Sequence, residues 1–172
     1  MLKKGYVQAY TGNGKGKTTA ALGISLRAVC AGGKVFFGQF MKGQDYCELK
    51  ACRYLPGFEI EQFGGADFIC GKPSEADRIN AQNGLLRMKS VLESGEYDVV
   101  VFDEINTALY FELLTAEEVL SLLDLKPEKT EVILTGRYAP EEIIKRADLV
   151  TEMREVKHYY EKGVDARTGI EN

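Results

Sequence analysis

The segment YVQAYTGNGKGKTTAALG, residues 6–23, passes from a short apolar run through a loop of glycine and lysine into an alanine-rich run. The apolar run predicts a buried strand over residues 5–10, and the alanine-rich run predicts a helix over residues 17–31. Glycines let the backbone between them curl so that several N–H groups converge on phosphate oxygens. The helix start adds its positive dipole end to the charge of Lys17, and Thr18 offers a hydroxyl to a divalent metal ion. This segment therefore predicts a loop that binds a polyphosphate.

The loop departs from the usual pattern G-x-x-x-x-G-K-[ST] at one position. Thr11 stands where the first glycine belongs, whereas Gly12 and Gly14 supply the flexibility and Lys15 adds a second cation. A glycine-rich turn without a ligand is the alternative interpretation. Two lysines in a loop between a buried strand and a helix have no structural purpose there, so the polyphosphate interpretation is favoured.

Apolar runs and helical patterns alternate along the rest of the chain. Ser74, with Asp77 three residues later, resembles a helix-capping arrangement, and Gly95 is typical of a helix end. Further buried strands are predicted over residues 35–40, 58–63, 97–102, 131–134 and 149–153, and further helices over residues 74–93, 115–125 and 140–147.

The run at residues 97–102 is nearly all apolar, which is typical of a strand in a parallel sheet covered on both faces. Strand–helix alternation then favours an α/β fold with a mostly parallel central sheet, built as a single domain over residues 1–172. Residues 39–71 carry few helical signals and are interpreted as a long functional excursion beside the carboxyl edge of the sheet. The last fifteen residues, from His158, are interpreted as a tail folded across the same edge.

The composition is that of an ordinary globular protein, with 45% hydrophobic and 28% charged residues in a chain of 172. A net charge of −4 predicts no broad basic face, so nucleic acid is not an expected partner. No apolar run approaches the ~20 residues needed to cross a bilayer, and no signal peptide precedes the first strand. We therefore expect a cytoplasmic protein with no membrane partner. The four cysteines fit no CxxC spacing and are expected to be free thiols: Cys30, Cys47, Cys52 and Cys70.

A second part of a nucleotide site is DVVVFDE, residues 98–104, in which an apolar strand ends in two carboxylates. In a parallel sheet this strand end lies at the same edge as the phosphate loop. Asp103 or Glu104 can there hold Mg²⁺, directly or through water, and the alternative is a pair of solvated carboxylates. Together with the loop, the motif favours ATP or GTP and a metal ion.

Three further residues are candidates for ligand contacts. Arg137 follows a predicted strand and precedes a helix, where it can reach a terminal phosphate or remain a surface arginine. Arg27, ten residues after Lys17, lies either near the nucleoside or on a solvated face of the first helix. His158 is the only histidine and stands beside Lys157 and two tyrosines, which suggests contact with a ligand or partner; a structural role is the alternative.

Five stretches together resemble the P-loop type of corrinoid adenosyltransferase, which acts on cob(I)alamin or cob(I)yrinic acid a,c-diamide: TGNGKGKTTAALG, GQFMKG, VVVFDEINTAL, LTGRYAPEEIIKRADLVTEM and VKHYYEKGVDARTGIE. The resemblance extends over nearly the whole chain. It implies a three-layer, RecA-like P-loop NTPase fold. It also implies transfer of the 5′-deoxyadenosyl group of ATP to the cobalt of a reduced corrinoid, with release of triphosphate. A homodimer, Mg²⁺ or Mn²⁺, and a reductase that donates the electron are implied as well.

The resemblance also implies roles for residues at the nucleotide. Asn13 would lie near the nucleotide, Thr18 and Glu104 would bind the metal ion, and Lys17 would be catalytic because it compensates triphosphate charge. The implied ATP-binding residues are Gly12, Asn13, Gly14, Lys15, Gly16, Lys17, Thr18, Thr19, Arg27 and Arg137.

At the corrinoid, the resemblance implies contacts by Phe68 and His158. Phe68 would be catalytic by pressing on the lower corrin face, which strips the axial ligand from cobalt and eases its reduction. Ile69 and Cys70 stand where some relatives carry a second, larger aromatic residue, so this sequence departs from the family pattern beside Phe68.

Two alternative functions remain. A P-loop nucleoside kinase of the thymidine-kinase type shares the core and the D-E strand end, but it carries a zinc ribbon of CxxC pairs that this chain lacks. A non-catalytic, nucleotide-gated RecA-like module would need no aromatic pocket beside the phosphates. The products formed from ATP, Mg²⁺ and reduced corrinoid distinguish the three: triphosphate with a light-sensitive Co–C product, ADP, or neither.

Overall fold

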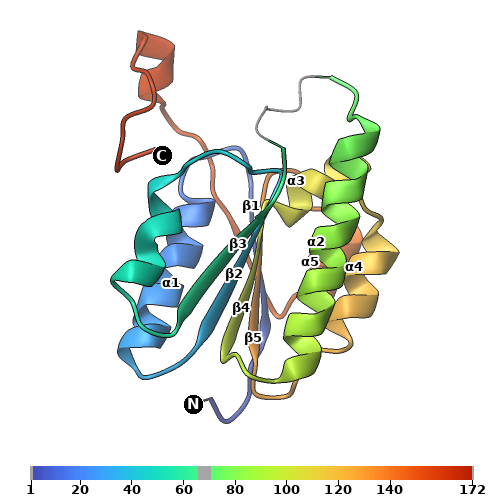
Figure 1. The fold of residues 1–172 in the computed structure, drawn as a ribbon. Helices are drawn as coiled ribbons and strands as arrows, with labels where there is room; N and C mark the ends of the chain where they lie inside the picture. Colours follow the sequence, from blue (N-terminus) through green and yellow to red (C-terminus); the bar gives the residue numbers. More distant parts are fainter. Residues whose placement is uncertain (1, 66–70, 172) are drawn as a thin grey trace.

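A computed structural model describes residues 2–65 and 71–171 of the chain. Its centre is a six-stranded sheet in the order β3-β2-β4-β5-β1-β6 (Figure 1). Every pair of neighbouring strands is parallel, so the predicted α/β fold with a parallel central sheet is confirmed. The strands are β1 (Val7–Thr11), β2 (Val35–Phe40), β3 (Phe58–Phe63), β4 (Val99–Asp103), β5 (Glu131–Thr135) and β6 (Leu149–Glu152).

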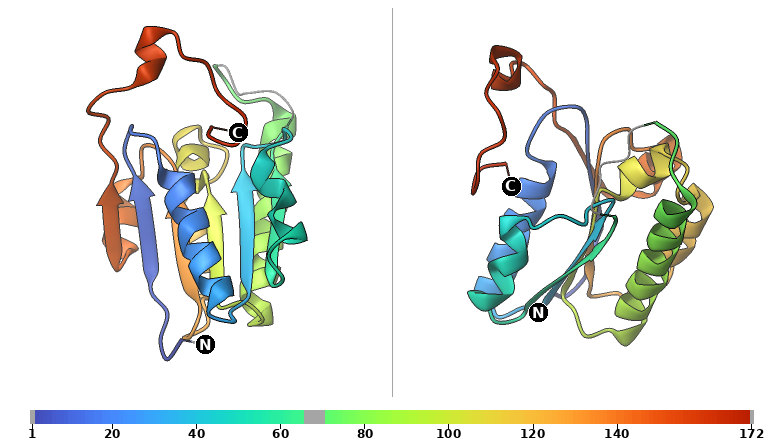
Figure 2. Two further views of the ribbon diagram at one scale, coloured as in Figure 1. Left: turned by 90° about the vertical axis from the view of Figure 1, so that its left-hand side faces the viewer. Right: turned by 45° about the horizontal axis from the view of Figure 1, so that its top comes forward.

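Helices cover both faces of this sheet and give a three-layer architecture, as Figure 1 and Figure 2 show. One face carries α1 (Lys17–Cys30) and the 3-10 helix η1 (Cys47–Arg53). The opposite face carries α2 (Glu75–Ser94), α3 (Ile105–Tyr110), α4 (Ala116–Leu123) and α5 (Glu141–Arg146).

Among the helices of the described residues, none is both long enough and apolar enough to cross a membrane.

The central strand β4 is buried along its whole length. Val100 and Phe102 pack into the core on the α2 side of the sheet, whereas Val99 and Val101 pack into the core on the α1 side. Successive side chains of a strand point to opposite faces. A continuous apolar run is therefore stable only where both faces are covered, which is the arrangement that the sequence predicted.

The cap predicted for α2 is confirmed. The Asp77 backbone N–H donates to the Ser74 hydroxyl at 3.2 Å, and the Ser74 N–H donates to the Asp77 carboxylate at 2.8 Å. The helix ends at Gly95, which has a φ of 63° in the left-handed region that favours glycine. These local hydrogen bonds fix where α2 begins and ends.

Four elements differ from the predictions. The helices α3, η1 and η2 (Tyr159–Lys162) were not predicted. They are only six, seven and four residues long, and they do not begin at a proline that marks a helix start, as the equally short α5 does. The prediction of a buried strand over residues 149–153 was wrong in its burial. All four residues of β6 are exposed, since β6 lies at the edge of the sheet with β1 as its neighbour.

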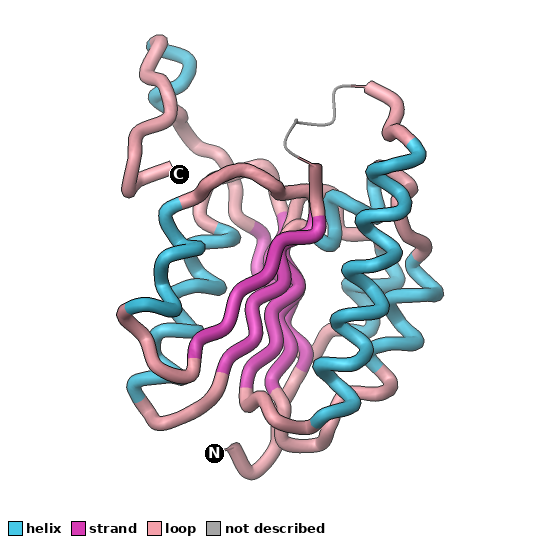
Figure 3. Tube along the Cα trace, in the orientation of Figure 1, coloured by secondary structure: helices cyan, strands magenta, loops and turns pink. Residues whose placement is uncertain are grey.

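The loops that follow the carboxyl ends of the strands gather at one end of the sheet (Figure 3). The chain after β6 rises to the same end and folds back over the start of α1, as predicted for the tail (Figure 1). Ligands of open parallel sheets bind in the crevice outside the carboxyl ends of the strands. The predicted site residues therefore converge where the fold favours binding.

Candidate active site

The predicted phosphate loop, residues 12–16, joins the carboxyl end of β1 to the first turn of α1. Gly12 and Gly16 have φ values of 93° and 118°, which glycine adopts without steric cost. The Lys17 ammonium donates to the carbonyl oxygen of Gly12 at 2.7 Å and to that of Gly14 at 2.8 Å. Burial lowers the pKa of Lys17, and the nearby Glu104 carboxylate opposes that shift. The lysine is thus held against the loop at the site where an anion would bind.

The loop packs backbone to backbone against the chain that leaves β6. The Gly14 N–H donates to the carbonyl oxygen of Met153 at 2.7 Å. A Cβ atom would lie 2.5 Å from that same oxygen if built on Gly12 and 2.7 Å from it if built on Gly14. Both glycines are therefore needed for the close approach of the two segments, and not only for the curl of the loop.

Thr11 explains the departure from the usual phosphate-loop pattern. Its hydroxyl accepts a hydrogen bond from the backbone N–H of Ala139 at 3.1 Å. Ala139 belongs to the turn between β5 and α5. The side chain that replaces the first glycine thus fastens the start of the loop to the neighbouring turn.

A cavity of about 730 Å³ opens beside the loop. Of the predicted site residues that the structure describes, all line it except Gly12, Arg27 and Asp103. Gly12 contributes its carbonyl to Lys17, and Phe68 lies outside the described residues. Arg27 is exposed in the last turn of α1, ten residues or ~15 Å of helix from Lys17, so its role stays a prediction.

Asp103, at the end of β4, is the buried centre of the site, with no exposed surface. Its Oδ1 accepts from the hydroxyl of Thr18 at 2.8 Å and from that of Thr135 at 2.7 Å. Its Oδ2 accepts from the ammonium of Lys42 at 2.8 Å and from the amide of Gln39 at 3.2 Å. Four donors from three segments (α1, the end of β2 and β5) fix this carboxylate, so Asp103 orients Thr18 while Glu104 faces the cavity.

Lys42 is a cavity residue that the sequence prediction missed, although it belongs to the quoted stretch GQFMKG. Burial favours a lower pKa for Lys42, but the charge and hydrogen bond of Asp103 outweigh it, so the pKa is raised. Met41 before it has a φ of 58°, which is unusual for a side chain with a Cβ. A Cβ atom on Gly64 would lie 2.4 Å from the Lys42 backbone nitrogen. The glycines of this region let two loops pack closely and aim the lysine at Asp103.

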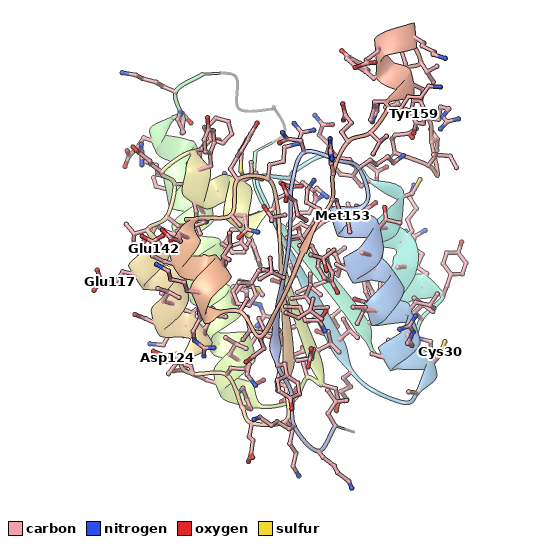
Figure 4. All side chains as sticks on the ribbon, turned by 180° about the vertical axis from the view of Figure 1, so that it is seen from behind. Cys30, Glu117, Asp124, Glu142, Met153 and Tyr159 are labelled. Atoms are coloured by element: carbon pink, nitrogen blue, oxygen red, sulfur yellow. The ribbon has the colours of Figure 1, made fainter. Side chains whose placement is uncertain are left out.

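The tail closes over the loop through Lys15. The Lys15 ammonium donates to the Tyr159 hydroxyl at 2.9 Å and also to the Glu171 carboxylate. Arg167 donates to the same carboxylate at 3.2 Å. Hydrogen bonds from Arg167, Lys15 and Tyr159 hold the pKa of Glu171 far below its ordinary value. Figure 4 shows Met153 and Tyr159 along the segment that leaves β6 and passes the start of α1.

His158 lines the cavity from this tail. Its Nδ1 accepts the backbone N–H of Tyr160 at 3.0 Å and caps the short helix η2. The local role of the ring is therefore structural, while its position beside the cavity agrees with a contact to a ligand.

The sheet order, the glycine–lysine loop at the start of α1 and the acidic end of β4 define a three-layer α/β protein built like the P-loop NTPases. A family model for ATP:corrinoid adenosyltransferase BtuR/CobO/CobP matches residues 3–172. The chain belongs to this family, which confirms the resemblance and the prediction of an enzyme.

Three relatives named as corrinoid adenosyltransferases align with 98% of this chain. The corrinoid adenosyltransferase of Escherichia coli strain K12 is 34% identical over 169 residues, which are 98% of this chain and 86% of the relative. The corrinoid adenosyltransferase CobA of Salmonella typhimurium strain LT2 is 36% identical over the same shares. The corrinoid adenosyltransferase of Pseudomonas aeruginosa strain PAO1 is 33% identical over 171 residues, 98% of this chain and 84% of the relative.

Proposed function

We propose that this enzyme takes the 5′-deoxyadenosyl group from ATP, transfers it to the cobalt of a reduced corrinoid and releases triphosphate. The observation that carries the proposal is the cavity wall, which combines the phosphate loop with the cationic side chains of Lys15, Lys17 and Arg137. A glycine-rich loop at a helix start and several cations suit a polyphosphate. The family description, which names ATP and a corrinoid, supports the same substrates.

In the proposed reaction, the electron pair of Co(I) forms the Co–C5′ bond. The C5′–O bond breaks, and its electron pair leaves with the triphosphate. Negative charge therefore grows on the phosphate oxygens as the group departs. Loop N–H groups, Lys17 and Arg137 would stabilise that charge electrostatically. The nucleophile belongs to the corrinoid, so the reaction requires no protein base.

The oxygen donors at this edge fit Mg²⁺ or Mn²⁺. The Thr18 hydroxyl donates its proton to Asp103, which leaves its oxygen lone pairs available. Glu104 uses Oε2 to accept from Thr107 at 2.5 Å, and its Oε1 makes no hydrogen bond among the described residues. Mg²⁺ commonly binds through one or two protein oxygens together with phosphates and water. We propose Thr18 and Glu104 as its ligands, and the ion would neutralise part of the triphosphate charge.

We further propose that residues 1–172 act as one domain, in the cytoplasm, as a homodimer that receives electrons through a reductase. No nucleic acid or membrane takes part in this proposal. His158 from the tail and Phe68, which lies outside the described residues, are proposed to contact the corrinoid. Relatives named corrinoid adenosyltransferase, which align with 98% of this chain, support a corrinoid as the ligand at these residues.

Incubation of the purified chain with ATP, Mg²⁺ and chemically reduced cobalamin tests the proposal. We expect triphosphate and a corrinoid whose visible spectrum reverts on exposure to light, because the Co–C bond is photolabile. Production of ADP independent of corrinoid would indicate a kinase or NTPase, and no turnover would indicate a nucleotide-gated module. Phosphate-containing products resolved by ³¹P NMR distinguish the three results.

A further inference from the structure

Two turns at the carboxyl edge meet at the hydroxyl of Thr107, in the first turns of α3. The hydroxyl donates to Glu104 Oε2 at 2.5 Å. It also accepts the backbone N–H of Arg137 at 3.1 Å. One side chain thus bridges the turn that follows β4 and the turn that follows β5.

The chemistry of the partners fixes the direction of both hydrogen bonds. A backbone N–H only donates, so the Thr107 oxygen must accept from Arg137. An ionised carboxylate only accepts, so the Thr107 proton must point to Glu104. The Thr107 hydroxyl gives its one proton to Glu104 and uses a lone pair to accept from Arg137, so it makes both hydrogen bonds at once. The methyl group of the side chain can make neither bond.

Both turns need backbone conformations that a hydroxyl contact helps to hold. Glu104 lies in the left-handed region with a φ of 60°, which is costly for a residue with a Cβ. Gly136 has a φ of 127°, and a Cβ atom there would lie 2.8 Å from both the backbone nitrogen and the hydroxyl oxygen of Thr107. The turn that follows β5 therefore packs directly against Thr107, and its position depends on that residue.

We infer that Thr107 is a positioning residue that sets Glu104 and Arg137 at a fixed spacing for the metal–triphosphate complex. Among residues 2–65 and 71–171, no hydrogen bond engages Oε1 of Glu104, which stays available at the cavity that Glu104 and Arg137 both line. The bond to the Arg137 N–H fixes the backbone from which the guanidinium reaches that cavity. This inference rests on the proposed function, in which Glu104 binds the metal ion and Arg137 binds phosphate.

The test compares Thr107→Val, which keeps the shape and removes the hydroxyl, with Thr107→Ser, which keeps the hydroxyl. Thr151→Val, at an exposed position of β6, is the matched control. Mn²⁺ binding in the presence of ATP is followed by the EPR signal of free Mn²⁺, and kcat and KM are measured for adenosyl transfer. Partners of metal ligands commonly change metal affinity 10–100-fold, so we expect Thr107→Val to weaken Mn²⁺ binding by about 10-fold or more. Thr107→Ser restores most of that loss.

Two outcomes overturn the inference. One is wild-type Mn²⁺ affinity and kinetics in Thr107→Val; the other is equal loss in the Val and Ser variants, which would assign the effect to packing. Should Thr107→Val fail to fold in a thermal melt, Thr107→Ala replaces it in the same comparison. Failure of the wild-type chain to adenosylate corrinoid refutes the proposed function instead, and the EPR comparison then still decides the role of Thr107 toward the metal.

Discussion

Lys17 and Asp103 are the two charged residues that the fold buries most deeply at the site, and they are held in different ways. Lys17 is 7% exposed and bonds to carbonyl oxygens of its own loop. Asp103 has no exposed surface and bonds to donors from α1, the end of β2 and β5. Lys17 therefore can exchange its partners for an anion, whereas Asp103 is part of the framework.

Replacement of Lys17 by alanine tests the role of this lysine. We expect Lys17→Ala to abolish adenosyl transfer, because the triphosphate loses a buried cation that compensates its charge. Lys89→Ala, in an exposed ion pair of α2 with 48% of its side chain accessible, is the control and should keep full activity. Initial rates of corrinoid adenosylation measure both. Activity of Lys17→Ala within ~10-fold of the wild type, ~1.4 kcal/mol of barrier, would contradict the assignment.

We expect the contributions of Lys42 and Asp103 to the free energy of unfolding to be strongly coupled. Asp103→Ala removes the carboxylate at 2.8 Å from the ammonium of Lys42, whose side chain is 15% exposed, and leaves only that of Glu48 at 3.8 Å. We expect a loss of about 3 kcal/mol in the free energy of unfolding, because a largely buried charge that loses its hydrogen-bonded partner is costly. Asp103→Ala combined with Lys42→Met should lose less than the sum of the single changes. Urea titrations of the four proteins give the coupling, and additive losses would show that the two residues do not interact.

At the scale of elements, the site is built where α1, β4 and the chain after β6 meet. β4 delivers Asp103 because its apolar residues fill the cores on both faces of the sheet. α1 begins at the loop, and the segment from Met153 presses on that loop through backbone contacts. Packing of backbone against backbone requires glycine at Gly12 and Gly14, which are also the glycines that a phosphate loop uses.

Replacement by alanine should have opposite effects on stability at two glycines of this region. Gly14→Ala should destabilise the protein and weaken ATP binding, because its Cβ would lie 2.7 Å from the Met153 carbonyl oxygen. Gly23→Ala, in α1, meets no atom within 4 Å and should stabilise the helix by about 0.5–1 kcal/mol. Thermal unfolding and a fluorescent ATP analogue measure the two effects. Similar shifts in both variants would refute the role given to the Met153 contact.

At the scale of the whole molecule, a segment early in the sequence and the carboxyl-terminal tail meet at the site. Residues 12–16 form one side of the site and residues 158–171 form the other. Lys15 of the loop donates hydrogen bonds to Tyr159 and Glu171 of the tail and so joins the two sides. The tail carries large exposed side chains, including Val156 and Tyr160, so few apolar contacts fasten it. Its attachment therefore depends chiefly on the hydrogen bonds and charge of Glu171.

The attachment of the tail should depend on pH in a predictable direction. The folded-state pKa of Glu171 lies far below its ordinary value of 4.5, so its stabilisation is fully present above that value. It is lost as the pH falls below 4.5 toward the folded-state pKa. We expect pepsin to cleave the wild-type tail slowly at pH 4 and faster at lower pH, whereas Glu171→Gln is cleaved readily throughout. Glu161→Gln, at an exposed position of η2, should behave as the wild type; equal cleavage of all three proteins would contradict the role of Glu171.

Much of this architecture follows from local pattern in the chain. The continuous apolar run of β4, the alternation of strands and helices, and the cap of α2 depend on neighbours in sequence, and all three predictions were confirmed. The phosphate loop could also be predicted from the sequence, because its glycines, the start of α1 and Lys17 all lie within residues 12–18. The short helix α3 was missed, since six residues show no period and its start follows from the left-handed turn at Glu104.

What local pattern could not reveal is how residues far apart in the chain share a partner. Asp103 collects Gln39, Lys42 and Thr18, and Thr107 links Glu104 to Arg137 across 33 positions, as the folded chain shows. The exposure of β6 could not be predicted either, because an apolar run has the same sequence pattern whether its strand lies at the centre or at the edge of a sheet. Such contacts arise from the order of strands and the packing of turns. A sequence specifies them only through the complete fold, whereas the loop and the helix caps are already present in a few adjacent residues.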